Sequence, residues 1–168
     1  TTDGPNWVPT WDLNQPVSTW TGVVLVASPN ANRVKTLFLS NRGLTGSLPA
    51  DMNDLDSLTN LGIDQNNLTG LPDLSPIATN IAAFLADRNR LDFGDFEPSI
   101  GIGSVFLQIA PQDSLLENEE YTITQGGASQ EITCIVGGTM NSYQWQKNGV
   151  DIPGATQTNY FATEEGLF

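Results

Sequence analysis

Residues 44–74 read LTGSLPADMNDLDSLTNLGIDQNNLTGLPDL, and this stretch contains the same short phrase twice. Leu44-Thr45-Gly46 returns as Leu68-Thr69-Gly70, and Leu48-Pro49 returns as Leu71-Pro72. A phrase that recurs after a fixed interval in the twenties is typical of a repeat array, in which each copy is one supersecondary unit. The repeat is therefore the feature that decides the fold.

A longer template, L-x-x-L-x-L-x-x-N-x-L, extends outward from the second phrase. Three copies agree with it, 24 and 23 residues apart, and their template positions are Val34, Leu37, Leu39, Arg42, Leu44; Leu58, Leu61, Ile63, Asn66, Leu68; and Ile81, Phe84, Ala86, Asn89, Leu91. A further 21 residues on, Ile102, Val105 and Leu107 match the first half of the template before Ala110 and Pro111 break it. This partial copy predicts a fourth, terminal strand.

The spacing within a copy predicts a short strand followed by a turn. Leu37 and Leu39 alternate with Phe38 and its neighbours, so the leucines point to one face and Phe38 to the other. One copy cannot bury its own leucines, whereas parallel stacking of copies makes a continuous core. The asparagine after each strand can then satisfy backbone groups in the turn between neighbouring copies.

These residues resemble the plant-type leucine-rich repeat, L-x-x-L-x-L-x-x-N-x-L-x-G-x-[IL]-P, over roughly residues 30–110. Arg42 stands where the family has asparagine, and the third copy reads LDFGDF in place of the Leu-Thr-Gly turn. The resemblance implies a mainly β fold in which residues 34–112 form a short solenoid of about four parallel strands behind an N-terminal cap, residues 1–33.

The predicted cap is rich in tryptophan, with Trp7, Trp11 and Trp20 close together. It resembles the cap of the same family, whose C-x-W-x-G-V-x-C pattern is matched at Trp20, Gly22 and Val23, with Ser18 and Leu25 in the two cysteine positions. A cysteine-free cap resembles the bacterial secreted branch of the family. Two uses of the tryptophans stay open, a lid over the end of the leucine core and a sugar-stacking platform.

The periodicity changes after the repeats. YTITQGGASQEITCIVGG and NSYQWQKNGVDIPGAT alternate apolar and polar residues, and Asn148-Gly149 is a strong hairpin signal. Cys134 and Trp145 lie eleven residues apart and resemble the B and C strands of an immunoglobulin-like domain. That family continues with E-x-G-x-Y-x-C, and here Glu164, Gly166 and Phe168 begin the motif. The resemblance implies an antiparallel β-sandwich over residues 113–168, truncated before its last strand.

Composition argues against several classes of function. Six basic against 19 acidic residues give a net charge of -13, which repels nucleic acid and anionic lipid, and no apolar run is long enough to span a membrane. The absence of histidine and the single cysteine remove the usual zinc ligands and imidazole bases. We therefore expect no enzyme, cofactor or metal. The first residue is not Met and no signal sequence is visible, so we expect a processed or excised piece of a longer protein.

The strand positions opposite the leucines are the candidate binding residues. Phe38, Leu85 and Phe106 are predicted to form one apolar row, beside a row that contains the carboxylates of Asp64 and Asp87. An apolar stripe beside unpaired carboxylates predicts a site for a basic or amphipathic protein or peptide segment. The alternative is that a short solenoid merely tolerates these residues.

Other chemistry at these positions is weakly supported. A flat sheet gives Asp64 and Asp87 no cleft for acid–base catalysis, and no D-x-D-x-D-G calcium loop is present. The sequon Asn67-Leu68-Thr69 follows from the wording of the repeat and is interpreted as coincidence.

Two functions therefore compete. The first is a non-catalytic extracellular recognition or adhesion module of a bacterial secreted or surface protein, with a protein or peptide partner. The second is the accessory, polysaccharide-binding region of a larger secreted polysaccharide-degrading enzyme.

Overall fold

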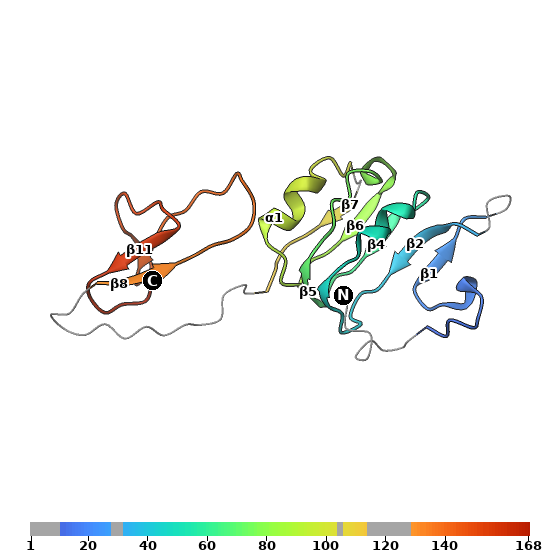
Figure 1. Cartoon of the computed structure of the whole chain (residues 1–168), viewed down its shortest axis with the longest axis horizontal. Helices are drawn as coiled ribbons and strands as arrows, with labels where there is room; N and C mark the ends of the chain where they lie inside the picture. Colours follow the sequence, from blue (N-terminus) through green and yellow to red (C-terminus); the bar gives the residue numbers. More distant parts are fainter. Residues whose placement is uncertain (1–10, 28–31, 104–105, 114–128) are drawn as a thin grey trace. The chain divides into compact units, whose positions relative to one another are not determined.

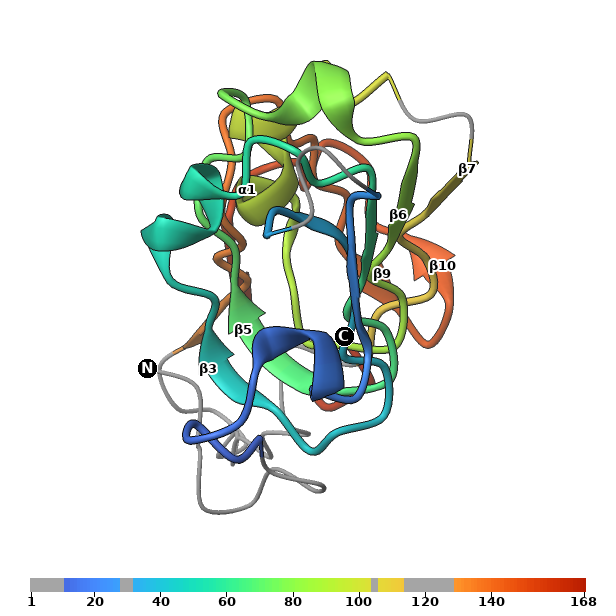
Figure 2. The same cartoon turned by 90° about the vertical axis from the view of Figure 1, so that its right-hand side faces the viewer.

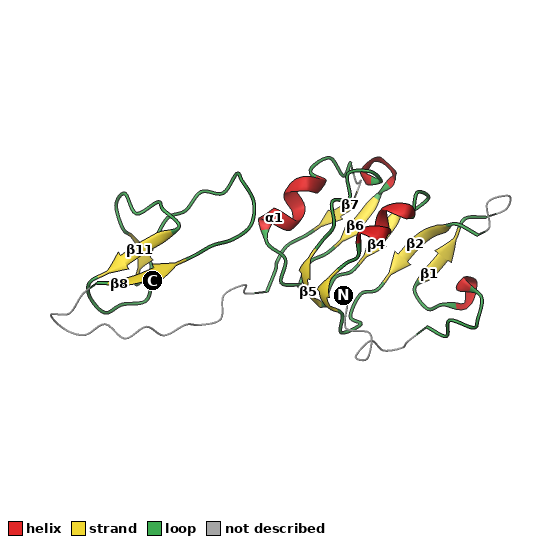
Figure 3. Ribbon diagram, viewed as in Figure 1, coloured by secondary structure: helices red, strands yellow, loops and turns green. Residues whose placement is uncertain are grey.

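The structure is a computed structural model that describes residues 11–27, 32–103, 106–113 and 129–168. These residues are mainly β with little helix (Figure 1, Figure 3). The chain divides into two compact units, Thr1–Leu115 and Leu116–Phe168. The predicted boundaries of cap, repeats and immunoglobulin-like region remain predictions within this division.

The first unit is built on a five-stranded sheet in the order β1-β2-β4-β6-β7. Its strands are β1 (Val23–Leu25), β2 (Val34–Phe38), β4 (Asn60–Gly62), β6 (Ala83–Leu85) and β7 (Phe106–Gln108). β1 pairs antiparallel with β2, and every other pair is parallel. Each parallel strand comes from the next copy of the repeat, which agrees with the predicted stacking.

The return segments between these strands are short and irregular. Two of them contribute a small parallel sheet of β3 (Thr45–Ser47) and β5 (Asn67–Gly70), which includes the Thr-Gly of the first Leu-Thr-Gly phrase and all of the second. Figure 2 shows β3 and β5 across the unit from β6 and β7. The described helices are short, three to five residues each: η2 (Val17–Thr19), η3 (Ala50–Asp54), η4 (Ala78–Asn80), α1 (Phe93–Phe96) and η5 (Glu97–Ser99).

The apolar template positions fill the space between the five-stranded sheet and the return segments. Leu58, Leu61, Ile63 and Leu68 have no exposed surface, and Phe84 and Leu91 are 1% exposed. The predicted inward direction of the leucines is therefore confirmed. A fully buried leucine contributes about 1.5 to 3 kcal/mol through removal of its apolar surface from water.

The template asparagines connect neighbouring copies through their side-chain amides. Asn66 Nδ2 donates to the carbonyls of Leu39 at 2.9 Å and Ile63 at 2.8 Å, while Asn66 Oδ1 accepts from the N–H groups of Arg42 at 2.9 Å and Leu44 at 3.1 Å. Asn89 repeats the pattern one copy later, with Nδ2 donating to the Ile63 carbonyl at 2.9 Å. These bonds satisfy buried turn groups that have no partner in the sheet.

The fourth copy has a different register from the predicted one. Leu107 pairs with Phe84, so β7 is displaced by two residues from the prediction, and the predicted partner Val105 lies outside the described residues. Gln112 takes the asparagine position, because its Nε2 donates to the Ala86 carbonyl at 2.9 Å and its Oε1 accepts from Leu91 N–H at 3.2 Å. Ala110 and Pro111 therefore lie within this copy and do not interrupt it.

The segment before the repeats closes one edge of the sheet through β1. Phe38 N–H donates to the Gly22 carbonyl at 2.7 Å, and Gly22 has φ of +87°. Trp11 packs against the buried core, as a lid would. Trp7 lies outside the described residues.

The second unit contains two separate two-stranded antiparallel sheets in its described part. β8 (Gln130–Thr133) pairs with β11 (Asn159–Ala162), and β9 (Gln146–Lys147) pairs with β10 (Val150–Asp151). Asn148 and Gly149 both have positive φ, 52° and 79°, which confirms the predicted hairpin turn. The immunoglobulin-like sandwich stays a prediction, because each described sheet of this unit has only two strands.

Candidate functional site

The candidate site is the face of the five-stranded sheet that points away from the core, which we call the open face. Strand alternation places on it the side chains that the sequence analysis assigned to this face, and the antiparallel pairing adds Val24 beside Thr36. In strand order the open-face positions are Val24; Thr36, Phe38, Ser40; Asn60, Gly62, Asp64; Ala83, Leu85, Asp87; and Phe106, Gln108.

Large apolar side chains are exposed on the open face. Phe38 is 41% exposed, Phe106 is 57% exposed and Val24 is 53% exposed, while Leu85 is half-buried. The Phe38 ring lies across β4, because a Cβ at Gly62 would be 2.5 Å from Phe38 Cδ1. The glycine thus provides the space that the ring occupies.

The predicted single apolar row is wrong, because β7 is displaced. Phe38 is in register with Gly62, Leu85 and Gln108, whereas Phe106 is in register with Ala83. Leu85 and Phe106 are diagonal neighbours on adjacent strands, a relation in which large side chains still reach one another. The apolar surface is accordingly a patch over two rows.

The two aspartates of the predicted site are buried, which differs from the exposed and unpaired carboxylates that we expected. Asp64 is 9% exposed and accepts hydrogen bonds from Ser40 Oγ and from Gln65 Nε2, the latter at 3.0 Å. Asp87 is 2% exposed; its Oδ2 lies 3.8 Å from Arg88 Nε, and its Oδ1 has no hydrogen-bond partner among the described residues. The side chains of Ser40, Gln65 and Arg88 contact these carboxylates. Strand spacing alone does not predict such contacts, and for this reason the sequence predicted exposed carboxylates.

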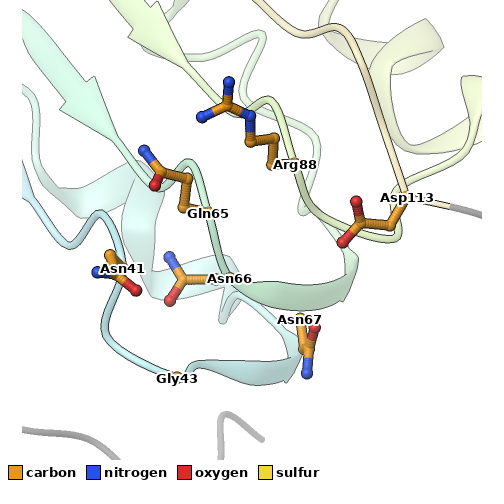
Figure 4. A pocket seen from close by; sticks show the side chains of 7 residues that line it. All are labelled: Asn41, Gly43, Gln65, Asn66, Asn67, Arg88 and Asp113. Atoms are coloured by element: carbon orange, nitrogen blue, oxygen red, sulfur yellow. The ribbon is translucent and has the colours of Figure 1, made fainter.

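The turns after the strands form a polar cavity that the sequence analysis missed. Asn41, Gln65 and Arg88 occupy the same place in three consecutive copies and share a left-handed backbone, with φ of 53°, 57° and 53°. Figure 4 shows these side chains on successive turns, together with Asn66, Asn67 and Asp113. The cavity measures about 320 Å³, and its lining is Asn41, Gly43, Gln65, Asn66, Asn67, Arg88 and Asp113. In the sequence, the signal for this cavity is a polar residue directly before the asparagine position of each repeat copy.

A second cavity of about 260 Å³ lies beside the cap tryptophans. Its lining combines aromatic, hydroxyl, amide and carboxylate side chains: Trp11, Asp12, Gln15, Thr19, Trp20 and Thr21. This combination is common in sites for small polar molecules that carry an apolar face.

Neither a cluster of metal ligands nor a membrane-spanning helix is present among the described residues. There, no three or more Asp, Glu, His or Cys side chains gather as a metal ion would require. No helix in the described ranges has both the length and the apolar character to cross a bilayer.

The chain has weak sequence similarity to leucine-rich repeat receptor-like kinases, although no protein-family model matches it. It is 29% identical over 82 residues to the receptor-like kinase TMK2 of Arabidopsis thaliana, which is 48% of this chain and 9% of TMK2. It is 36% identical over 66 residues to a probable leucine-rich repeat receptor-like serine/threonine-protein kinase of the same plant, 39% of this chain and 7% of that protein. The chain thus spans less than a tenth of either relative, and the similarity supports leucine-rich repeat character for the matching segment.

Solved structures give partial matches. The BIR2 ectodomain of Arabidopsis thaliana matches with a TM-score of 0.42 and 21% identity, over 54% of this chain and 62% of BIR2. A chain of the BIR3–SERK2 complex from the same plant matches with a TM-score of 0.36 and 20% identity, over 46% of this chain and 54% of that chain.

Proposed function

We propose that the chain is a non-catalytic protein-recognition module of the leucine-rich repeat type, and that its partner docks on the open face. The observation that carries this proposal is the apolar patch of Phe38, Leu85 and Phe106 on a regular hydrogen-bonded sheet. Large apolar side chains at the centre of an interface supply most of its binding energy. A rigid sheet holds them in place before binding, which lowers the entropic cost of association.

The partner's chemistry follows from the surroundings of the patch. The chain carries a net charge of -13, and Asp64 and Asp87 follow β4 and β6, two neighbouring strands of the sheet that bears the patch. An amphipathic segment with basic side chains would therefore be steered toward this face. Both aspartates are buried. Their role in binding is therefore to attract basic side chains through their negative charge and to hold the contacting side chains of Ser40, Gln65 and Arg88 in place.

Several finer features belong to the same proposal. We propose an extracellular protein of a bacterial secreted or surface type, used in adhesion, with the second unit as an incomplete immunoglobulin-like domain. The cysteine-free cap pattern and the Cys134–Trp145 spacing support these assignments. The weak similarity to receptor-like kinases is consistent with a role in recognition.

The test uses peptides selected against the whole chain from a random-peptide library, because selected peptides concentrate on binding hot spots. Affinity is measured by fluorescence anisotropy for the wild type and for the triple variant Phe38→Ser, Leu85→Ser, Phe106→Ser. The matched control is Leu13→Ser, Phe93→Ser, Ile100→Ser, which changes three exposed apolar residues outside the open face.

We expect the open-face variant to bind at least about 100-fold more weakly, while the control binds like the wild type. Circular dichroism should show that both variants stay folded, since the changed side chains are outside the core. Equal binding by the open-face variant and the wild type would refute the proposed surface.

The second candidate function, an accessory glycan-binding region of a larger secreted polysaccharide-degrading enzyme, is favoured by a different observation. Trp11 and Trp20 are stacked, with ring centroids 4.7 Å apart, beside a polar cavity. This feature is independent of the open face.

A further inference from the structure

We propose that the cavity beside the stacked tryptophans is a saccharide-binding site, formed by Trp11, Asp12, Gln15, Thr19, Trp20 and Thr21 and here called the tryptophan site. The inference rests on this geometry and would stand if the open face had no protein partner. Its ligand would be a neutral oligosaccharide of pyranose rings with equatorial hydroxyl groups.

The two indole rings are held in fixed orientations. Their planes are 15° from parallel at a centroid distance of 4.7 Å. Trp11 Nε1 donates to the Thr21 carbonyl at 3.0 Å, and Trp20 Nε1 donates to the Asp12 carbonyl at 3.1 Å. Because both N–H groups are satisfied and the rings stack on each other, only their outer apolar faces remain for a ligand, which bears little of the cost of ordering the rings.

The two tryptophans do not contribute equally to the core. Trp11 packs against the buried cluster, whereas Trp20 is not among the described residues that contact it. Closure of the core therefore explains Trp11, whereas the ring of Trp20 stacks on Trp11 and bonds to the Asp12 carbonyl. A half-buried tryptophan that lines a cavity and covers no core is suited to stacking on a ligand.

Polar groups surround the rings within the same short segment. Asp12 Oδ1 accepts from the N–H and side-chain amide of Asn14, at 2.9 Å and 3.2 Å, which leaves Oδ2 for a ligand hydroxyl. Thr19 Oγ1 donates to the Pro16 carbonyl at 2.8 Å and can still accept a hydrogen bond. The side-chain amide of Gln15 forms no hydrogen bond to any described residue and can both donate and accept.

This arrangement matches the chemistry of a pyranose ring. Equatorial hydroxyl groups surround such a ring, and its axial C–H bonds form an apolar face that can stack on an indole. A cavity of about 260 Å³ is slightly below the usual range for small-molecule sites and suits one or two sugar rings. The carboxylate of Asp12 and the net charge of -13 argue against an anionic sugar. The turn cavity of Figure 4 has no aromatic lining and lacks this stacking surface.

The experiment titrates the full chain with cellohexaose, xylohexaose and chitohexaose and follows tryptophan fluorescence and calorimetric heat. The test variants are Trp20→Ala, Trp20→Phe and Gln15→Ala; the last change is at an exposed residue, so the fold should be preserved. The matched controls are Trp145→Ala in the second unit and Asn41→Ala in the turn cavity.

We expect millimolar or tighter binding of at least one hexasaccharide, weakened roughly tenfold or more by Trp20→Ala and by Gln15→Ala. Trp20→Phe should keep part of the affinity, because phenylalanine retains an aromatic face. Both controls and the open-face triple variant should bind like the wild type. Absence of binding up to about 10 mM, unchanged affinity in Gln15→Ala and Trp20→Phe, or a loss confined to Asn41→Ala would overturn the proposal.

Discussion

Two consecutive asparagines have different roles in the repeat. The side chain of Asn66 is 5% exposed and bonds to backbone groups of two copies, whereas Asn67 is exposed and its side chain makes no hydrogen bond to a described residue. Asn66→Ala leaves several buried backbone groups unpaired and should lower the free energy of unfolding by about 2 kcal/mol or more. Asn67→Ala should change it by less than about 0.5 kcal/mol. Urea denaturation of both variants measures the difference, and equal effects would contradict the proposed amide ladder.

Asp95 belongs to the LDFGDF segment, which stands in the third copy where the earlier copies have the Leu-Thr-Gly turn. It accepts from Leu71 N–H at 3.2 Å and from Asp92 N–H at 2.9 Å. Partial burial raises the pKa of Asp95 above its ordinary value of 3.8, against the lowering effect of these two bonds. The folded state therefore holds this proton more tightly than the unfolded state, and the stabilisation is lost as pH rises through the raised pKa.

The stability of Asp95→Asn, measured by urea denaturation against pH, isolates this contribution. Relative to the variant, the wild type should lose stability as pH rises above the ordinary carboxyl pKa of 3.8. The opposite slope in the difference would mean that the hydrogen bonds outweigh burial.

At the scale of elements, β1 depends on one glycine. Gly22 has φ of +87°, and a Cβ there would collide with the backbone carbonyl oxygen of Phe38. Gly22→Ala should therefore separate β1 from β2 and cost about 2 kcal/mol or more. Gly103→Ala is the control, because among the described residues the nearest atom outside its chain neighbours would be 3.9 Å from its Cβ. Thermal melting of the two variants compares them, and a tolerated Gly22→Ala would argue against the observed docking of β1.

The sequence predicted strands and turns correctly where one alternating apolar pattern or one turn motif determines them. The leucines of β2 and β4 and the Asn148-Gly149 hairpin follow directly from alternation and turn chemistry. The register of β7 was wrong because Gln112, one methylene longer than asparagine, takes the template position. Asp64 and Asp87 are buried by packing and by contacts from the side chains of the following turns. The alternation of apolar and polar residues along a strand does not predict these contacts.

At the scale of the whole molecule, the division into two units predicts that damage to one core stays local. Leu61 is fully buried at the centre of the first unit, so Leu61→Ala should lower the stability of that unit by about 2 to 5 kcal/mol. Hydrogen exchange should show faster exchange in β4 and β6 and unchanged exchange in β8 and β11. Leu13→Ala, at a residue that is 78% exposed, should have little effect. Equal acceleration in both units would contradict their separation.

Hydrogen exchange of the complex with a selected peptide shows whether the partner binds on the open face. Slower exchange is expected in β2, β4, β6 and β7, whose open-face side chains the peptide would cover. The amides of η3, η4 and α1, and those around Trp11 and Trp20, should exchange at the rates of the unbound chain. Protection confined to those segments, with the four strands unchanged, would contradict the account.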